Sequence, residues 1–328
     1  MKFLLAAASV IFASSTFAVT KINGAGATFP YPIYSKWFSE YKNKNSQIEI
    51  NYQSIGSGGG IRQVVSQTVD FGASDAPMSD KDKSGAPYKI THIPTVLGAV
   101  VPVFNLKDVK SLKLDGETLA NIFMGKITKW NHPTLMKLNP EAKLPNEDIL
   151  VVRRADGSGT TSVFADYLSS VSKEWESSIG RGKSLQWPVG IGSKGNEGVT
   201  ATVKQTEGAI GYVELSYAIT NQLNMASMKN SAGEFVTPSI ESVSKAAEGV
   251  SDPSGEFTSS IVNSSAKGSF PIASFTYILL PEKKDDSKNK EIKKFLKWAL
   301  TDGQKFAKEL HYAPLPSKVA KQVVEKLK

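Results

Sequence analysis

The sequence predicts an α/β protein with two lobes, and three observations support this expectation. The chain has 328 residues, segments with strand and helix patterns alternate along it, and two apolar, β-rich segments bracket its central part. A chain of this length exceeds one ordinary hydrophobic core, and alternating strands and helices are typical of α/β proteins. The composition agrees, because 40% hydrophobic and 21% charged residues are the proportions of a globular chain and exclude disorder throughout.

The N-terminus has the pattern of a secretory signal peptide over residues 1–18. Lys2 precedes a short apolar run, and the small residues Thr16 and Ala18 fit cleavage before Val19. The run is too short for a membrane-spanning helix, which needs roughly 20 apolar residues. The alternative to a signal peptide is a buried N-terminal helix. Because the chain has no cysteine, it has no disulfide, no thiolate metal site and no lipid-bearing cysteine. We therefore expect a periplasmic protein that is secreted through a cleaved signal peptide and is not lipid-anchored.

The clearest unit near the N-terminus has the order strand, loop, helix. Residues 48–52 alternate with the period of a strand, a glycine-rich loop follows at 56–60, and helical spacing begins at Ile61. Another helix is expected to begin near Pro32, because proline is favoured in a first turn and apolar residues follow at helical spacing. The sequence thus predicts that each of these helices begins just after a loop of small residues.

A second unit of the same order lies in the middle of the chain. Residues 149–152 are a continuous apolar strand, 155–159 a loop, and the apolar positions from Val163 to Val171 one face of a helix. Two more helices are expected near the C-terminus, at 292–299 and 319–327.

The two bracketing segments, 95–105 and 273–280, are candidates for paired strands that cross between the lobes. In that arrangement the first lobe contains both ends of the chain, residues 19–96 and 272–328, and the second lobe contains residues 97–271. The alternative is that both segments are ordinary sheet strands within one lobe.

Three loops place small residues and hydroxyl groups just before predicted helices: GAGATFP at 24–30, IGSGGG at 55–60 and DGSGTT at 156–161. The first N–H groups of a helix have no partner within the helix, and together with the helix dipole they form a site for an anion. Hydroxyl donors accompany them at Thr28, Ser57, Ser158 and Thr160. Each loop alone is also compatible with an ordinary turn. Together the loops predict a site for a tetrahedral oxyanion.

Two charged residues narrow the choice of anion. Arg154 offers a planar, permanently charged fork, and Asp156 is near enough in sequence to hold that fork in position. Asp75, in the segment ASDAP, repels an anion unless the anion donates a hydrogen bond to it. Phosphate keeps at least one proton near neutral pH and sulfate keeps none, so Asp75 in the site favours phosphate. The alternative for Asp75 is a helix cap or a turn residue before Pro77.

Other kinds of site lack their motifs. The chain has no complete dinucleotide fingerprint, no P-loop and no nucleophile elbow around Ser158, and its histidines, His92, His132 and His311, lack metal-ligand spacing. The net charge of +8 favours anionic partners, but no basic block interleaved with aromatic residues predicts nucleic-acid binding. We expect no metal, no cofactor and no nucleic acid. Two alternatives remain: an enzyme with Ser158 or Thr160 as nucleophile, and a receptor for another oxyanion such as sulfate, molybdate or arsenate.

At this point the motifs resemble a known family. GAGATFP, YQSIGSGGGIRQV, DFGASDAPMS, IFMGKITKWN, VVRRADGSGTT and GAIGYVE occur in this order in the periplasmic phosphate-binding proteins of the phosphate-specific (Pst) ABC importer, and the similarity runs from about Ile22 to the C-terminus. The resemblance implies a class II periplasmic binding fold, in which two α/β lobes joined by crossing strands hold the ligand in the interlobe cleft. It also implies a receptor rather than an enzyme, which closes around desolvated phosphate and delivers it to the membrane permease. We expect a monomer.

The resemblance assigns phosphate contacts to eight residues, four from each lobe. These are Thr28, Phe29 through its backbone N–H, Ser57, Asp75, Arg154, Ser158, Gly159 and Thr160, with Asp156 as the supporting partner of Arg154. One position departs from the family pattern, because Gly58 stands where many relatives have a second serine. This difference puts one secondary hydroxyl contact in doubt.

Overall fold

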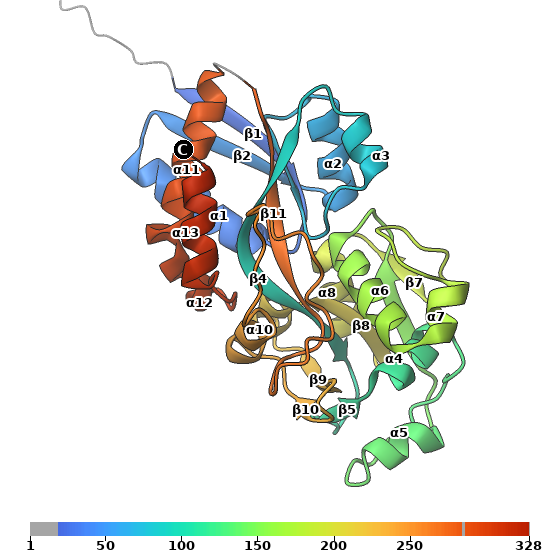
Figure 1. Cartoon of the computed structure of the whole chain (residues 1–328). Coiled ribbons are helices and arrows are strands. Elements are labelled where there is room, and N and C mark those ends of the chain that lie inside the picture. Colours follow the sequence, from blue (N-terminus) through green and yellow to red (C-terminus); the bar gives the residue numbers. More distant parts are fainter. Residues whose placement is uncertain (1–18, 284–285, 328) are drawn as a thin grey trace, which may run out of the picture.

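The computed structural model describes residues 19–283 and 286–327, so the expected signal peptide at 1–18 lies outside the described residues. Figure 1 shows two lobes, with the long strands β4 (Ile90–Phe104) and β11 (Ala273–Pro281) lying side by side where the lobes join. The upper lobe contains the first strands and the last helices of the chain. The expected two-lobed α/β architecture is therefore present.

The first lobe is built on a mixed sheet with the strand order β2-β1-β3-β11-β4. Strand β1 runs parallel to β2 and β3, whereas β11 runs antiparallel to β3 and β4. Its remaining elements are β1 (Thr20–Gly26), β2 (Ile48–Ser54), β3 (Phe71–Ser74), α1 (Tyr31–Lys44), α2 (Ser57–Val65), α3 (Asp80–Ser84), α11 (Ser287–Leu300), the 3-10 helix η1 (Asp302–Gln304), α12 (Lys305–Glu309) and α13 (Ser317–Lys326).

The second lobe continues from the far end of β4 with the strand order β4-β8-β6-β7. Strand β6 runs parallel to β8 and β7, and a side branch is formed by β9, which pairs with β4, β5 and β10. Its elements are β5 (Leu112–Leu114), β6 (Leu150–Arg154), β7 (Ile191–Ser193), β8 (Ala209–Glu214), β9 (Asn224–Lys229), β10 (Phe235–Val236), α4 (Gly116–Phe123), α5 (Pro133–Leu138), α6 (Gly159–Val171), α7 (Lys173–Ser178), α8 (Gly195–Gln205), α9 (Leu215–Thr220) and α10 (Ile240–Ala246).

Strand β4 belongs to both sheets, because its first part pairs with β11 and its last part, from Val100, pairs with β8. It begins at residue 90. The sequence predicts a start five residues later, at residue 95, because Pro94 interrupts the strand pattern. Proline has no N–H to donate to a neighbouring strand. The sheet accommodates it with a shift of register opposite Thr276, and Thr95 uses its hydroxyl to bond the Thr276 carbonyl at 3.1 Å.

The predicted apolar helix faces form the two cores. Each fully buried large side chain contributes about 1.5–3 kcal/mol of hydrophobic stabilisation. In the second lobe, Phe164 of α6 stacks on Tyr212 of β8 with ring centroids 4.2 Å apart. In the first lobe the face predicted to follow Pro32 is buried on α1: Ile33, Tyr34, Trp37, Phe38 and Tyr41.

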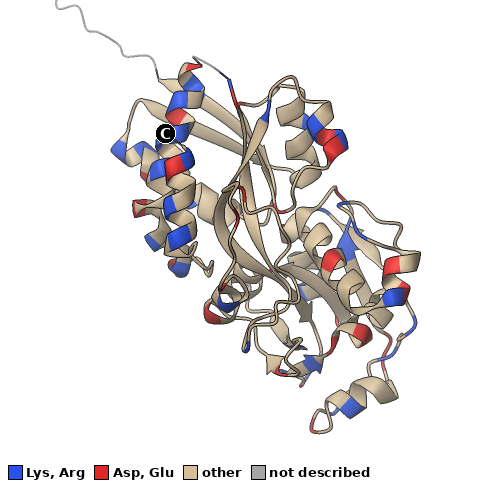
Figure 2. Ribbon diagram, viewed as in Figure 1, with Lys and Arg blue, Asp and Glu red and all other residues tan. Residues whose placement is uncertain are grey.

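Charged side chains concentrate on the outer helices. Figure 2 shows many Lys and Arg residues on the C-terminal helices and few on the strands between the lobes. Along α11, four lysines are at least partly exposed: Lys288, Lys290, Lys293 and Lys294. Within residues 19–283 and 286–327, no helix has the length and apolar character that crossing a membrane requires.

Candidate functional site

The predicted loops meet where the two lobes touch. The backbone N–H of Gly58, at the start of α2, donates to the carbonyl of Gly157, just before α6, at 2.8 Å. A Cβ atom added to Gly58 would lie 3.2 Å from the Gly157 Cα, which is a tight contact. The glycine that departs from the family pattern therefore lies at a close contact between backbones of the two lobes.

Thr28 and Phe29 lie in the turn between β1 and α1, with both side chains buried. Their carbonyl groups accept hydrogen bonds from tyrosine hydroxyls, Thr28 from Tyr217 at 2.7 Å and Phe29 from Tyr312 at 2.6 Å. Among the described residues the Phe29 N–H has no hydrogen-bond partner. The turn is thus fixed through its carbonyls, and its amide is left as a donor.

Asp75 follows β3 and is 2% exposed. Its Oδ1 accepts a hydrogen bond from the Thr276 hydroxyl at 2.8 Å, and its Oδ2 accepts one from Ser57 at 3.3 Å. Burial raises the pKa of Asp75 to about 7, although the bonds from Thr276 and Ser57 and the charge of Arg154 lower it. The cap interpretation is wrong, because Ser79 caps the next helix through a capping box. Asp75 instead points into the interlobe contact.

Arg154, at the end of β6, is 3% exposed and paired with Asp156. Its Nε donates to Asp156 Oδ1 at 2.8 Å, its Nη2 donates to Oδ2 at 2.5 Å, and its Nη1 donates to the Thr160 hydroxyl at 3.3 Å. Partial burial raises the pKa of Asp156, but the bonds and charge of Arg154 outweigh this effect and hold it below its usual range. The bidentate pair fixes the guanidinium plane, as the sequence predicted.

Ser158, Gly159 and Thr160 form the start of α6 and are all buried. Ser158 caps the helix, because its hydroxyl oxygen accepts from Thr161 N–H at 3.0 Å, and its own N–H donates to the Lys183 carbonyl at 2.8 Å. In the described part of the chain, the first-turn backbone N–H groups without an acceptor are those of Gly159 and Thr160. A Cβ at Gly159 would lie only 2.3 Å from Ser57 Oγ and 2.4 Å from Asp75 Oδ2. Only glycine allows this approach of the two lobes.

The structure therefore brings together all eight candidate residues and Asp156 at one interlobe position. Sequence reasoning missed Asn196, which is fully buried in the first turn of α8. Its Nδ2 donates to the hydroxyls of Thr28 at 2.7 Å and Thr160 at 3.1 Å. The signal available was the segment KGNEG at 194–198, a further glycine-containing helix start of the kind found in the other loops.

Other candidate sites lack such convergence. His92, which is buried, has both ring nitrogens engaged, Nε2 by Met78 N–H at 3.0 Å and Nδ1 by Glu256 at 3.0 Å, so it is not placed as a base for Ser158. Within the part of the chain that the structure describes, no group of acidic, histidine or cysteine side chains could hold a metal.

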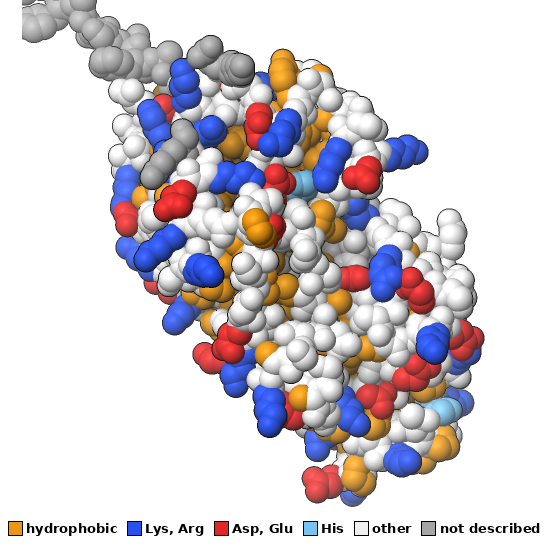
Figure 3. All heavy atoms as spheres, viewed as in Figure 1, with side chains coloured by type: hydrophobic (Ala, Val, Ile, Leu, Met, Phe, Trp, Pro, Cys, Tyr) orange, Lys and Arg blue, Asp and Glu red, His pale blue; other side chains and the backbone are white. Residues whose placement is uncertain are grey.

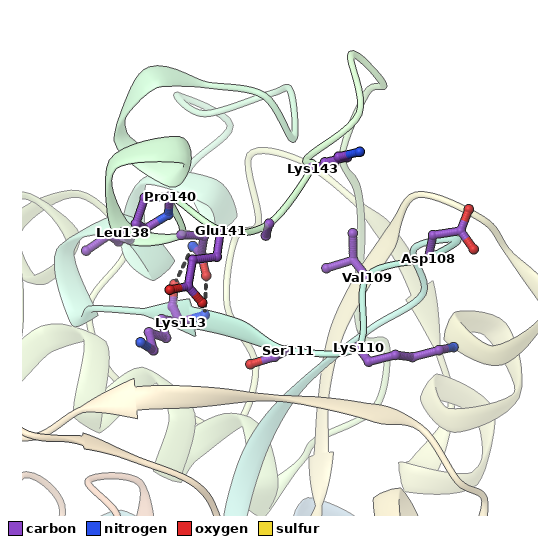
Figure 4. A pocket seen from close by; sticks show the side chains of 11 residues that line it. Asp108, Val109, Lys110, Ser111, Lys113, Leu138, Pro140, Glu141 and Lys143 are labelled. Atoms are coloured by element: carbon purple, nitrogen blue, oxygen red, sulfur yellow. Dashed lines mark hydrogen bonds between the residues drawn. The ribbon is translucent and has the colours of Figure 1, made fainter.

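A cavity of about 580 Å³ lies between α5 and β5, at the end of the second lobe away from these loops (Figure 4). Its lining mixes lysines such as Lys110 and Lys143 with the carboxylates of Asp108 and Glu141. Mixed charges at an open rim do not form an anion site comparable to the buried one between the lobes.

Comparison with known proteins identifies the family. The model of the PBP superfamily domain matches residues 13–303. The chain is 47% identical over 317 residues to the phosphate-binding protein PstS of Pasteurella multocida, covering 94% of this chain and 91% of that one. This chain belongs to the PstS family. It is similarly 46% identical to the PstS of Haemophilus influenzae, with 92% and 91% of the two chains covered.

Solved structures show the same fold at lower sequence identity. The ancestral soluble variant of the human phosphate binding protein gives a TM-score of 0.76 at 20% identity, covering 93% of each chain. The phosphate binding protein of Stenotrophomonas maltophilia gives 0.72 at 18% identity with the same coverage. The predicted family and periplasmic binding fold are therefore confirmed. So is the prediction that the chain is not an enzyme, because PstS proteins are binding proteins.

Proposed function

We propose that the chain binds inorganic phosphate between its two lobes and delivers it to the membrane permease of an ABC importer. The observation that carries this proposal is the buried carboxyl of Asp75 among the donors of Ser57, Thr28, Gly159 and Arg154. The names of the relatives, PstS phosphate-binding proteins, support the same ligand. The expected contacts are those assigned above, with Phe29, Gly159 and Thr160 contributing backbone N–H groups.

Asp75 acts as the acceptor for the proton that phosphate carries. Every other contact to the anion is a donor, and the guanidinium of Arg154 balances its charge. Burial raises the pKa of Asp75, but the charge of Arg154 and the hydrogen bonds from Thr276 and Ser57 oppose this effect and favour the ionised carboxylate, which accepts the phosphate proton. Sulfate brings no proton at this pH and would leave two unprotonated acceptors facing each other in a buried site.

Release and capture require the lobes to separate, because the contact residues are almost completely buried in this arrangement. We place the lobes at 19–96 with 272–328, and at 97–271. Support comes from β4 and β11, which carry the chain between the two sheets. Bending at these strands opens and closes the site as a hinge.

The protein operates in the periplasm as a monomer, without a cofactor and without a nucleic-acid partner. Localisation rests on the signal-peptide pattern of residues 1–18 and on the absence of cysteine from the sequence. Figure 3 supports the exclusion of nucleic acid on the face that it shows, because Lys and Arg side chains there are interspersed with Asp and Glu.

Isothermal titration calorimetry of the mature chain with phosphate and with sulfate tests the proposal. We expect tight binding of phosphate and no measurable binding of sulfate. Equal affinity for the two ions would overturn the role given to Asp75, and no binding of phosphate would overturn the proposed function itself.

A further inference from the structure

We infer that Asn196 is a positioning residue that turns the hydroxyl hydrogens of Thr28 and Thr160 toward the anion. The inference rests on the proposed function and adds a residue that does not itself contact the ligand. It starts from the burial of Asn196, which is fully shielded from solvent, and from its place in α8 opposite the β1–α1 turn.

The orientation of the Asn196 amide is set by its acceptor end. Oδ1 accepts a hydrogen bond from the backbone N–H of Glu214 at 2.9 Å, and an N–H can only donate. The NH₂ end must therefore face the other way, toward Thr28 and Thr160. The two hydrogens of Nδ2 match these two partners, so every hydrogen-bonding position of the amide is used except one lone pair of Oδ1.

Both threonine oxygens are consequently filled as acceptors. Thr28 Oγ1 accepts from the Asn196 backbone N–H at 3.1 Å and from Nδ2 at 2.7 Å. Thr160 Oγ1 accepts from Asn196 Nδ2 at 3.1 Å and from Arg154 Nη1 at 3.3 Å. A hydroxyl oxygen has two lone pairs and one hydrogen. With both lone pairs engaged, each hydroxyl has only its hydrogen left to use.

Neither hydrogen has a protein acceptor among the described residues, although both side chains are at most 2% exposed. A buried donor without an acceptor is costly, and a bound oxyanion supplies the acceptor that both lack. Asn196 thus converts two groups that could donate or accept into dedicated donors. It also links the lobes, because Thr28 follows β1 and Thr160 lies in the first turn of α6.

The test is a mutant cycle on phosphate affinity in the full mature chain. Asn196→Ala removes one of the two donors to each threonine hydroxyl, so that each hydroxyl can turn its hydrogen away from the anion. We expect phosphate affinity to fall at least about tenfold, as for weakened hydrogen bonds to a charged group. The same substitution is then made in a Thr28→Val, Thr160→Val chain, where there is no hydroxyl to orient. There the further loss should be less than about twofold, since coupled residues are not additive.

Two more variants keep the test informative. Asn196→Asp keeps the size of the side chain but replaces the donor with an acceptor, so the hydroxyls turn away from the anion and binding falls further than in Asn196→Ala. Its loss should shrink in the double-valine chain, where only charge repulsion remains. Thr200→Val, one turn further along α8 and also buried, is the matched control and should bind phosphate as the unsubstituted chain does.

A purely structural role for Asn196 predicts a different pattern. The inference would be overturned if the losses of phosphate affinity from Asn196→Ala and from the two valine substitutions simply multiplied. It would also be overturned if Asn196→Ala left the affinity unchanged, or if Asn196→Asp reduced it equally with and without the two threonines. Failure of the unsubstituted chain to bind phosphate would overturn the proposed function, and the inference with it.

Discussion

Replacement of Asp75 by asparagine should stabilise the ligand-free protein at neutral and alkaline pH. The carboxyl is buried, and its pKa rises from an ordinary 3.8 to about 7 in the folded chain. The folded state therefore holds a proton that the unfolded state has lost between these values, and stability decreases as pH rises from about 4 to about 7. Above that range, the difference of about 3 pKa units lowers the free energy of unfolding by about 4 kcal/mol, at about 1.36 kcal/mol per unit.

Asparagine removes this cost because it is neutral at every pH and has nearly the same shape. We expect the free energy of unfolding of Asp75→Asn to exceed that of the unsubstituted chain by about 3 kcal/mol more at pH 8 than at pH 5. Urea unfolding followed by circular dichroism, in buffers free of phosphate, measures this difference. Asp148→Asn is the control, since that side chain is 84% exposed and its charge contributes little. The reasoning would be refuted if the free energies of unfolding of Asp75→Asn and of the unsubstituted chain changed with pH in the same way.

Three further predictions concern other contacts. Gly159→Ala should weaken phosphate binding by at least about tenfold in calorimetry, because its Cβ would lie 2.3 Å from Ser57 Oγ and hold the lobes apart; unchanged affinity would show that the lobes need not approach so closely. The bonds from His92 lower the pKa of the Glu256 carboxyl to about 2, so its stabilising contribution is present above about pH 4.5 and lost as pH falls toward 2. Glu256→Gln should therefore remove about 1–2 kcal/mol of this acid-dependent stability, after allowance for solvent screening. Coinciding acid-unfolding curves of the variant and the unsubstituted chain would contradict this prediction. Thr200→Val should raise the free energy of unfolding in urea by about 1 kcal/mol, since the buried Thr200 hydroxyl has no hydrogen-bond partner among the described residues. A loss of stability would argue against that geometry.

Sequence reasoning found those parts of the site that are local in the chain. Helix starts with glycine and a hydroxyl, and an arginine two residues from an aspartate, are patterns within a few residues, and the structure places Ser57, Ser158 and Arg154 as those patterns suggested. The order of strands and helices followed in the same way from periodicity.

Contacts between distant segments could not be found in this way. The closest partner of Asp75, the Thr276 hydroxyl, is 201 positions away along the chain. Asn196 lies in a helix start that is visible in the sequence, but its contact with Thr28 of the other lobe is not. The early start of β4 was hidden because Pro94 interrupts the strand pattern, and the strand that accommodates it through a shift of register, β11, lies far away along the chain.

The position of β11 between β3 and β4 has a consequence for how the chain reaches its folded form. Synthesis proceeds from the N-terminus, so four strands of the first-lobe sheet, β1 to β4, are made long before β11, which lies between β3 and β4. Until residues 273–281 are made, β3 and β4 each present an open edge to which another chain could add. The second lobe, by contrast, has all its described strands by residue 236 and can fold first, and the last sixth of the chain, from residue 273, then completes the first lobe by insertion. Insertion of β11 closes both edges at once, because it pairs with β3 on one side and with β4 on the other.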